Sequence, residues 1–391
     1  EIRAAMGDAA LNAAKQLGYS SAGTVEFLLS GTEFYFLEVN ARLQVEHPIT
    51  EAIIGQDLVR EQIRVAEGER LSFTQEDLSI NGHAIEARLC AEDPSNDFLP
   101  SPGPVTIWTP SAIGNARFDS GVESGSMIAT EFDPMIAKVI VHAPTRREAA
   151  SRLARVLETT RIQGLTTNRD FLVGVLRSAA FINGDTTTDF IERVNIDRMR
   201  PISAAELADA AIATVMESQA LNRARAKVLK KIQSGWRNTM MPFESISFRL
   251  GDAECEIFYR SRRDGCFRVR VNDSVDEIIV QPYECGNGKV DVAIDGRRVS
   301  YDIEQSQSTW LVHGQNGDLA LDELPRYPLT SADELGGGTV APMPGSVLVV
   351  TVKPGSTVTK GDLLVILEAM KMEHRITAPR DGVVESTHVA V

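Results

Sequence analysis

The spacing of apolar residues divides the chain into two parts with different secondary structure. In the first part, apolar residues at every third or fourth position predict helices over residues 1–20, 50–67, 146–160 and 168–179. Two strand-like runs, Ala22–Leu29 and Glu33–Val39, are joined by a short polar turn, which predicts a hairpin. Between residues 83 and 143 the pattern predicts short strands that prolines interrupt. This part is therefore expected to mix helices and sheets.

A change to a period of two near residue 236 marks the second part. Before it, Ser203 and Glu206 form a capping-box pattern that opens a helix to about Lys231. The apolar stripe of this helix comprises Leu207, Ala211, Val215, Ala220, Ala224 and Val228. After it, seven or so alternating runs lie between residues 246 and 312, with Asp264-Gly265 and Asp295-Gly296 as hairpin turns. Strands of this kind close into a barrel or a sandwich, with the helix as a filler or a lid.

The last unit, residues 339–391, contains an internal repeat. Ala341-Pro342-x-x-Gly345-x-Val347 returns as Ala378-Pro379-x-x-Gly382-x-Val384, at an offset of 37 residues. Two copies of one strand-and-turn unit predict a small β-barrel with approximate twofold symmetry. By the same offset Val391 corresponds to Pro354, so this barrel is expected to be incomplete. Residues 326–338, before it, have the composition of a linker.

Length, charge and cysteine content exclude several classes of protein. The 391 residues predict two to four domains, and because the chain begins at Glu1 within a helical pattern, an N-terminal part is expected to be absent. With 40 Lys and Arg against 54 Asp and Glu, the net charge is −14, so we expect no nucleic-acid and no membrane partner. The four cysteines show no CxxC spacing, which predicts neither a zinc site nor a disulfide framework.

A string of alternating polar residues at the predicted hairpin carries the first chemical signal. Its polar members are Glu38, Asn40, Arg42, Gln44 and Glu46, and an extended chain would place all five on one face. Glu26, on the neighbouring strand, is expected to approach Glu38. Two carboxylates with an amide oxygen suit Mg²⁺, the guanidinium suits a small oxyanion, and Glu46 is placed to act as a base. From periodicity alone, a solvated strand face is the alternative.

The residues around this string resemble biotin carboxylase. The resemblance rests on GTVEF, EVNARLQVEHPITE and GHAIEARLCAEDP, and it covers residues 1–195, with the end of an ATP-grasp domain at 1–70 and a C-terminal subdomain at 71–195. It implies that Glu26, Glu38 and Asn40 hold the Mg²⁺ or Mn²⁺ ions that bridge the ATP phosphates. It also implies that Arg42, Gln44 and the backbone of Val45 hold bicarbonate, that Glu46 deprotonates it, and that Arg88 stabilises the enolate form of biotin.

Two further expectations concern this first segment. His47 and His83 flank the motifs and are expected to be structural residues. The family supplies a glycine-rich loop over the ATP phosphates, and nothing before Glu26 matches that loop. We therefore expect this chain by itself not to bind ATP productively and to be inactive alone.

The third unit resembles the biotin carboxyl carrier domain. The string Glu368-Ala-Met-Lys-Met-Glu-His carries the resemblance, together with APMPG at Ala341–Gly345. It implies that Lys371 is biotinylated by a biotin protein ligase and that Met370 and Met372 flank the modified residue. Lipoyl domains share the barrel and are the alternative, but they usually lack the two methionines. A solvated hairpin tip is what a lysine there would otherwise indicate.

The order of the units suggests the whole protein. Residues 196–325 resemble the BT-type interaction domain, a helix wrapped by an antiparallel β-barrel, so the chain is expected to be a multidomain α+β protein that ends in an all-β biotinyl barrel. This order is typical of α subunits of biotin-dependent acyl-CoA carboxylases, which are ligases. Such a subunit uses ATP and bicarbonate to carboxylate biotin, and then passes the carboxyl group to a carboxyltransferase β subunit that acts on an acyl-CoA.

Several properties of the complex follow from the same resemblance. The KMEH string favours 3-methylcrotonyl-CoA over propionyl-CoA or acetyl-CoA as the substrate at the partner. A large hetero-oligomer is expected, in the bacterial cytoplasm or the mitochondrial matrix. The alternative is a non-catalytic biotinylated carrier or scaffold protein, against which the intact set of polar residues at 26–46 argues.

Overall fold

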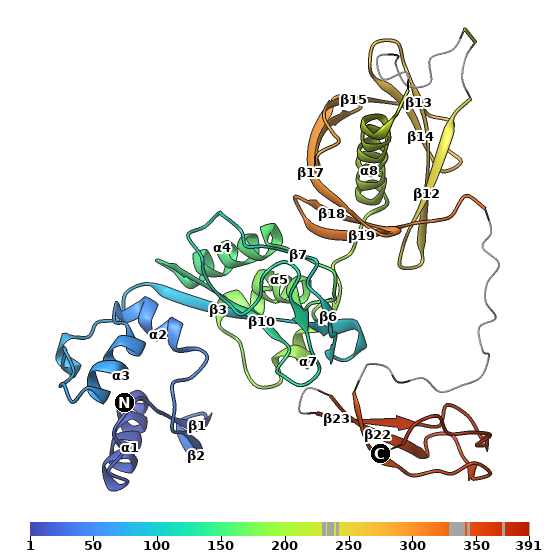
Figure 1. Ribbon diagram of the computed structural model, residues 1–391. Coiled ribbons are helices and arrows are strands. Elements are labelled where there is room, and N and C mark those ends of the chain that lie inside the picture. Colours follow the sequence, from blue (N-terminus) through green and yellow to red (C-terminus); the bar gives the residue numbers. More distant parts are fainter. Residues whose placement is uncertain are drawn as a thin grey trace.

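The computed structural model describes residues 1–228, 232, 238–239, 242–327, 341, 345–369 and 372–390. The expected mixture of helix and sheet, the antiparallel barrel around a helix and the small C-terminal β unit are all confirmed (Figure 1). The predicted linker at 326–338 lies outside the described residues except for its first two positions. In the part of the chain that is described, no helix is both long and apolar enough to cross a membrane.

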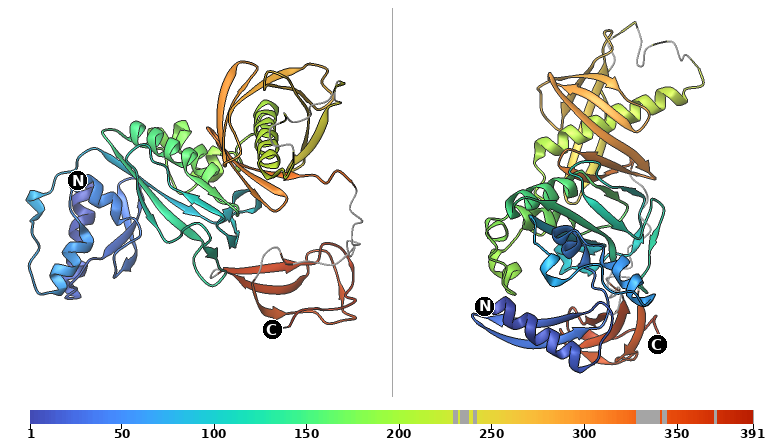
Figure 2. Two further views of the ribbon diagram at one scale, coloured as in Figure 1. Left: turned by 45° about the horizontal axis from the view of Figure 1, so that its top comes forward. Right: turned by 90° about the vertical axis from the view of Figure 1, so that its left-hand side faces the viewer.

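The first unit is a helix, a hairpin and two short helices. Its elements are α1 (Ile2–Gln16), β1 (Thr24–Ser30), β2 (Glu33–Asn40), α2 (His47–Ile54) and α3 (Leu58–Ala66). The helix expected over residues 50–67 is wrong as one element, because Gly55 adopts a left-handed conformation that ends α2, and Asp57 caps α3 by accepting a hydrogen bond from the Arg60 amide. Figures 1 and 2 show α1 beside the hairpin at one end of the molecule.

The second unit is built on a sheet with the strand order β3-β10-β8. These strands are β3 (His83–Cys90), β8 (Arg117–Ser120) and β10 (Met135–Ala143). One face of the sheet packs on α4 (Arg146–Thr159), because Ile85, Ala87 and Val139 point to that side with Leu153 and Leu157. The opposite face carries the charged residues of β3 and β10 and lies against α2.

Shorter elements complete this unit. They are the strands β4 (Glu92–Asp93), β5 (Leu99–Pro100), β6 (Gly103–Pro104), β7 (Ile107–Thr109), β9 (Met127–Ile128) and β11 (Arg161–Gln163), the helices α5 (Arg169–Arg177), α6 (Ala179–Asn183) and α7 (Phe190–Val194), and 3₁₀ turns at Gln75–Asp77 and Pro94–Asn96. Their brevity agrees with the short, proline-interrupted strands expected between residues 83 and 143.

The third unit is a closed antiparallel barrel around α8 (Ala204–Arg225). Its strands, in order around the barrel, are β12 (Glu244–Leu250), β13 (Ala253–Ser261), β14 (Phe267–Val271), β15 (Ile278–Glu284), β16 (Lys289–Ile294), β17 (Arg297–Ser306), β18 (Thr309–Gly314) and β19 (Gly317–Glu323). The prediction of seven or so strands ended one strand early, because β19, with Leu319 and Leu321 inward, closes the barrel against β12. Asp295 and Gly296 form the expected two-residue turn, both with positive φ.

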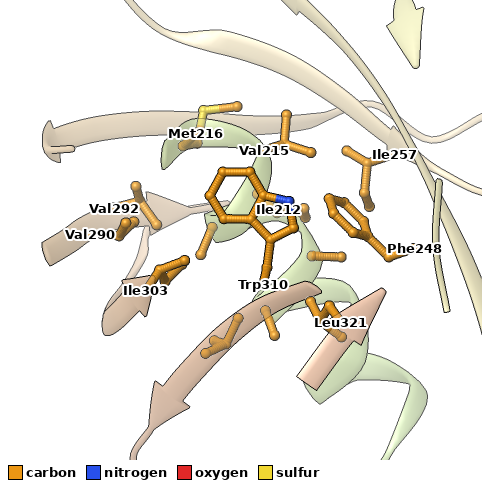
Figure 3. Close-up of a cluster of buried hydrophobic side chains, with 14 of the residues drawn as sticks. Ile212, Val215, Met216, Phe248, Ile257, Val290, Val292, Ile303, Trp310 and Leu321 are labelled. Carbon is orange, nitrogen blue, oxygen red and sulfur yellow. The ribbon is translucent and has the colours of Figure 1, made fainter. Parts of the chain in front are cut away.

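The helix inside the barrel differs from its prediction in two respects. It ends at Arg225 rather than near Lys231, and Val228 is exposed. Instead of one apolar stripe, every residue from Ala210 to Glu217 is buried, since the barrel surrounds the helix on all sides. Side chains of α8 and of the strands point toward one another around Trp310 (Figure 3).

Glu217 is the charged member of that buried set. Its carboxylate accepts hydrogen bonds from the amides of Gly286, at 2.5 Å, and Gly288, at 2.9 Å, in the loop between β15 and β16. A buried carboxylate needs such donors. The pair of hydrogen bonds therefore fixes the helix to one end of the barrel.

The barrel and the second unit meet at a buried ion pair. Arg169, at the start of α5, contacts Asp318 of β19, and both side chains are almost fully buried. Asp318 also accepts from the His313 ring at 2.6 Å and from the Ile162 amide at 3.1 Å. Burial alone would raise the pKa of Asp318, but the Arg169 guanidinium, the His313 ring and the Ile162 amide together outweigh burial and hold this pKa below its usual range. We call these residues (Arg169, Asp318, His313, Ile162) the seam.

The C-terminal unit consists of two small sheets. The strands β20 (Ser346–Val350), β22 (Leu363–Ala369) and β23 (Met372–Thr377) form one sheet, and β21 (Thr357–Val358) pairs with β24 (Gly382–Val383) in the other. A Cβ at Gly345 would lie 2.7 Å from the Glu368 carbonyl oxygen, so the first copy of the repeat requires glycine. The matching Gly382 has open space around it, so the two copies differ here.

Candidate functional site

Two carboxylates face each other across the hairpin of the first unit. Glu26 of β1 is the register partner of Glu38 of β2, next to a bulge in the ladder. The Asn40 amide donates to Glu26 at 2.8 Å and to Glu38 at 2.9 Å, and Gln44 donates to Glu26 at 2.6 Å. The expected approach of Glu26 to Glu38 is therefore confirmed.

The oxygen atoms of this set fit a hard divalent cation. We call Glu26 and Glu38 the acid pair. The side-chain amides of Asn40 and Gln44 donate to the same Glu26 oxygen, and their partial positive charge offsets the negative charge of the acid pair. A bound cation would offset the same charge. The two carboxylates and the Asn40 amide oxygen are the oxygen ligands that Mg²⁺ prefers alongside phosphate. Over the described residues, no group of three or more His, Cys, Asp or Glu side chains is arranged to hold a metal.

The polar string after Asn40 does not stay extended, so the prediction that its five polar side chains share one strand face is wrong. β2 ends at Asn40, residues 41–46 form a loop, and Glu46 is the N-cap residue of α2. In this loop the Arg42 guanidinium donates to Asn40 at 3.3 Å and the Gln44 side chain reaches back to Glu26. The loop thus joins the acid pair to the start of α2, whereas a straight strand would carry these groups away.

Glu46 and Arg88 meet at the junction of the first two units. The Arg88 guanidinium forms an ion pair with the Glu46 carboxylate, and each side chain is about half exposed. They are far apart in sequence, and the contact forms because α2 lies against β3. The two residues assigned to proton removal and to charge stabilisation are therefore brought together.

A row of charged residues on the sheet continues from Arg88. The register places Lys138 of β10 opposite Arg88 of β3 on one side and opposite Asp119 of β8 on the other. Lys138 binds Asp119 at 3.0 Å and the carbonyl oxygen of Val45 at 3.2 Å. Burial would raise the pKa of Asp119, but Arg117 and Lys138 outweigh it and lower this pKa. We call Arg88, Lys138 and Asp119 the charged row.

Glu86 lies two residues before Arg88, on the same face of β3. Within the described structure, both of its carboxylate oxygens are buried and have no hydrogen-bond partner. Burial raises its pKa to about 7; Lys138 acts against the shift and Glu46 adds to it. Glu86 is thus a carboxyl group that changes its charge near neutral pH beside the predicted site.

Both flanking histidines have partners, as their structural assignment requires. The His47 ring lies 2.8 Å from the Gln44 carbonyl oxygen. The His83 ring lies 3.3 Å from the Arg146 guanidinium. Burial lowers the pKa of His83, and the Arg146 charge lowers it further. Neither histidine contacts the acid pair or the charged row.

The predicted biotinyl site is only partly described. Met370 and Lys371 lie outside the described residues, and Met372 is described only through its backbone in β23. The ladder between β22 and β23 pairs Glu368 with Glu373 and Ala369 with Met372. The strands on both sides of the predicted site are therefore paired with each other.

Sequence reasoning missed Lys138, Asp119 and Glu86. Glu86 stands inside the quoted string GHAIEARL, and Lys138 interrupts the apolar run Met135–Val141. A single lysine in a strand that is otherwise buried signals a specific partner, since a buried charge must be compensated. Asp119 gave no signal of its own, because its role depends on the register of β8 with β10.

Comparisons with protein families match four segments of the chain. Residues 1–74 match the family described as carbamoyl-phosphate synthase L chain, ATP binding domain, and residues 86–193 match the biotin carboxylase C-terminal domain. Residues 203–326 match the BT domain of the methylcrotonyl-CoA carboxylase α subunit. Residues 339–391 match the family described as biotin-requiring enzyme. The acid pair falls in the first segment, and the charged row in the second.

Curated relatives match almost the entire chain. The mitochondrial methylcrotonoyl-CoA carboxylase subunit α of Mus musculus is 36% identical over 396 residues, which covers 98% of this chain and 55% of the relative. The mitochondrial propionyl-CoA carboxylase α chain of Sus scrofa is 37% identical, with 99% and 55% covered. The propionyl-CoA carboxylase α chain of Ruegeria pomeroyi is 34% identical, with 98% and 60% covered. The chain thus spans between 55% and 60% of the length of these relatives.

Among solved structures, the chain is similar to the biotin carboxylase domain of a Hydrogenobacter thermophilus 2-oxoglutarate carboxylase. The identity is 41%, the match covers 49% of this chain and 42% of that chain, and the TM-score is 0.48.

Proposed function

Because the chain belongs to the α-subunit family of biotin-dependent acyl-CoA carboxylases, we propose that it forms part of a ligase that carboxylates biotin with ATP and bicarbonate. The observation that carries the proposal is the assembly of the acid pair, the 41–46 loop and Arg88 into one site, although these residues come from two units of the chain. The same assembly argues against a non-catalytic carrier or scaffold, which has no need of it.

The proposed roles follow from charge and position. Glu26, Glu38 and Asn40 hold Mg²⁺ or Mn²⁺, which neutralises charge on the ATP phosphates when bound. Arg42, Gln44 and the Val45 amide hold bicarbonate, and Glu46 removes its proton. Arg88 stabilises negative charge on the ureido oxygen of biotin. The contact between Glu46 and Arg88 supports these roles, since it joins the base to the cation that serves the second reactant.

The attachment site of biotin is proposed to be Lys371, which lies in the sequence between β22 and β23. The match of residues 339–391 to the biotin-requiring family supports the proposal, as do the flanking methionines. A biotin protein ligase would modify this residue. Intact mass distinguishes the biotinyl group from a lipoyl group, and an unmodified Lys371 after coexpression with a ligase would contradict the assignment.

The partner and substrate are proposed from the family. We propose a carboxyltransferase β subunit that acts on 3-methylcrotonyl-CoA, in a large hetero-oligomer, because the barrel matches the BT domain of that α subunit and the KMEH string favours it. Propionyl-CoA is the second candidate substrate, because other relatives are propionyl-CoA carboxylase α chains. The compartment is proposed to be the mitochondrial matrix or the bacterial cytoplasm, as the origins of the relatives suggest. Assay of the purified complex with 3-methylcrotonyl-, propionyl- and acetyl-CoA identifies the substrate.

The central experiment measures bicarbonate-dependent ADP release by the full-length protein in the presence of free biotin. Glu46→Gln keeps the size of the side chain and removes the base, so the rate is expected to fall by about 100-fold or more. Glu69→Gln, an exposed acid of the same unit, is the matched control and is expected to retain the wild-type rate. An unchanged rate in Glu46→Gln would contradict the proposed mechanism, and the absence of bicarbonate-dependent ADP release in the wild type would contradict the proposed function.

A further inference from the structure

Lys138 is the member of the charged row that reaches from the sheet to the loop. It lies in the middle of β10, and its side chain is only 13% exposed. Its ammonium group donates to the Val45 carbonyl oxygen, at 3.2 Å, and pairs with Asp119 at 3.0 Å. A lysine so far withdrawn from water needs both partners, and it contributes a strong charge-assisted hydrogen bond to a backbone group.

The position of Lys138 in the sheet couples it to Arg88. The two residues are register partners on adjacent strands, and they point to the same face. Each reaches a consecutive residue of the first unit, Lys138 through the Val45 carbonyl and Arg88 through the Glu46 carboxylate. The sheet thus contacts the end of the 41–46 loop at two adjacent points.

The two contacts differ in what they fix. The ion pair of Arg88 with Glu46 joins two long side chains that are half exposed, so either can leave the other when a reactant arrives. The contact of Lys138 is made to the backbone and is anchored by Asp119, which Arg117 also binds at 2.8 Å. Lys138 therefore holds the loop in place without depending on the state of Glu46 or Arg88.

We propose that Lys138, anchored by Asp119, is a positioning residue for the carboxylation site. It holds the Val45 carbonyl against the sheet and thereby sets where the Val45 amide and the Glu46 carboxylate stand relative to Arg88. The catalytic role in this inference rests on the proposed function. The contact of Lys138 with the Val45 carbonyl and Asp119 does not depend on that function. In this proposal Lys138 acts through Val45 and Asp119.

Kinetics of the full-length protein test the catalytic part. Lys138→Met keeps the length of the side chain but leaves the Val45 carbonyl and Asp119 without their donor, so the KM for bicarbonate is expected to rise about 10-fold or more while the KM for ATP stays within about twofold. Lys138→Arg still donates and is expected to restore the bicarbonate KM to within about threefold. Asp119→Asn removes the anchor and should give an intermediate increase. Lys289→Met, at an exposed lysine of the barrel, is the control.

Hydrogen exchange tests the contact between Lys138 and the 41–46 loop without any assay of activity. In Lys138→Met the amides of residues 41–49 are expected to exchange faster than in the wild type, while the barrel strands keep their protection. Faster exchange in a protein that shows no carboxylase activity would overturn the proposed function but would still support the contact between Lys138 and the loop. Unchanged exchange, an unchanged bicarbonate KM in folded Lys138→Met, or equal effects on the KM values for bicarbonate and ATP would each overturn the positioning role.

Discussion

The barrel and the hairpin of the first unit are both built of antiparallel strands, yet they bury them very differently. In the barrel, Trp310, Phe248 and Ile257 are almost completely buried with the enclosed segment of α8. In the hairpin, Phe36 and Leu37 are 63% and 61% exposed, and no residue of β1 or β2, both fully described, is buried. The sequence therefore predicted strands in both places, from strand-like runs in the hairpin and from alternation in the barrel, but did not predict burial.

Closure explains the difference. A sheet that wraps around a helix places one residue of every pair inside, whereas a two-stranded hairpin has two open faces and is only marginally stable by itself. The exposed apolar side chains of β1 and β2 form the kind of surface that normally contacts another part of a protein. The acid pair thus sits on an element that depends on other contacts, while the barrel supplies its own core.

The largest expected effect comes from the centre of the barrel. Trp310→Ala removes a fully buried ring and its hydrogen bond to Glu323, so the free energy of unfolding is expected to fall by about 4 kcal/mol. Phe36→Ala in the hairpin is the matched control and should change it by less than about 0.5 kcal/mol. Urea unfolding monitored by circular dichroism measures both. Similar losses in the two variants would break the comparison.

The seam tests whether the barrel is independent of its neighbour. Asp318→Asn removes the buried partner of Arg169 and leaves Asp170, at 2.8 Å, as the remaining countercharge, so a loss of about 3 kcal/mol is expected at pH 7. Because the pKa of Asp318 is lowered in the folded state, the wild type should lose this stability only in acid, as the carboxylate becomes protonated. Asp264→Asn, which breaks an exposed ion pair, should cost less than about 0.5 kcal/mol in the same measurement. Equal stability of both variants would show that the barrel stands alone.

Glu86 sharpens the comparison at the sheet that lies against α2. Its pKa is raised in the folded state from 4.5 to about 7, so the folded protein binds more protons than the unfolded chain between these values. Stability is therefore expected to fall as the pH rises through this window, and to level off above it. Glu86→Gln should remove this fall, by about 1 kcal/mol after allowance for screening by nearby solvent. Thermal unfolding at pH 5 and pH 8 measures the difference, and an unaltered pH slope would refute it.

The smallest expected effect is in the hairpin. Phe36→Ser replaces an exposed ring, so the free energy of unfolding should change by less than about 0.5 kcal/mol. The same change should reduce self-association, since it removes part of an exposed apolar surface. Unfolding curves and light scattering measure the two quantities. A large loss of stability would mean that the ring is buried in solution.

Sequence reasoning reached the fold through local signals and missed what depends on distant partners. The Asp295-Gly296 turn, the Ser203 cap and the pairing of Glu26 with Glu38 were predicted because each depends on neighbouring residues or one hairpin. The bend after Asn40 was not predicted, because alternation of polar residues is compatible with a loop as well as a strand. The apolar stripe of α8 did not indicate its all-round burial, because that burial depends on a barrel that forms later in the chain; the resemblance to a helix wrapped by a barrel did.

The site shows the same division. Resemblance supplied Glu46 and Arg88, and the structure then showed their contact. Lys138 and Asp119 gain their positions only from the registers of β10 with β3 and β8, which no local pattern encodes. Glu86 looked like one more polar residue of a quoted motif until its burial was known.

The seam also has a consequence for building hybrid proteins. Arg169, which binds the barrel, follows directly after Asn168, whose side chain donates to the Arg88 carbonyl at 3.2 Å and accepts from the Cys90 amide at 2.9 Å. Two consecutive residues, Asn168 and Arg169, therefore connect the strand that carries Arg88 to the barrel. A barrel transplanted from a relative would have to bring the first turn of α5 with it, or the exchange would disturb the strand on which the site is built.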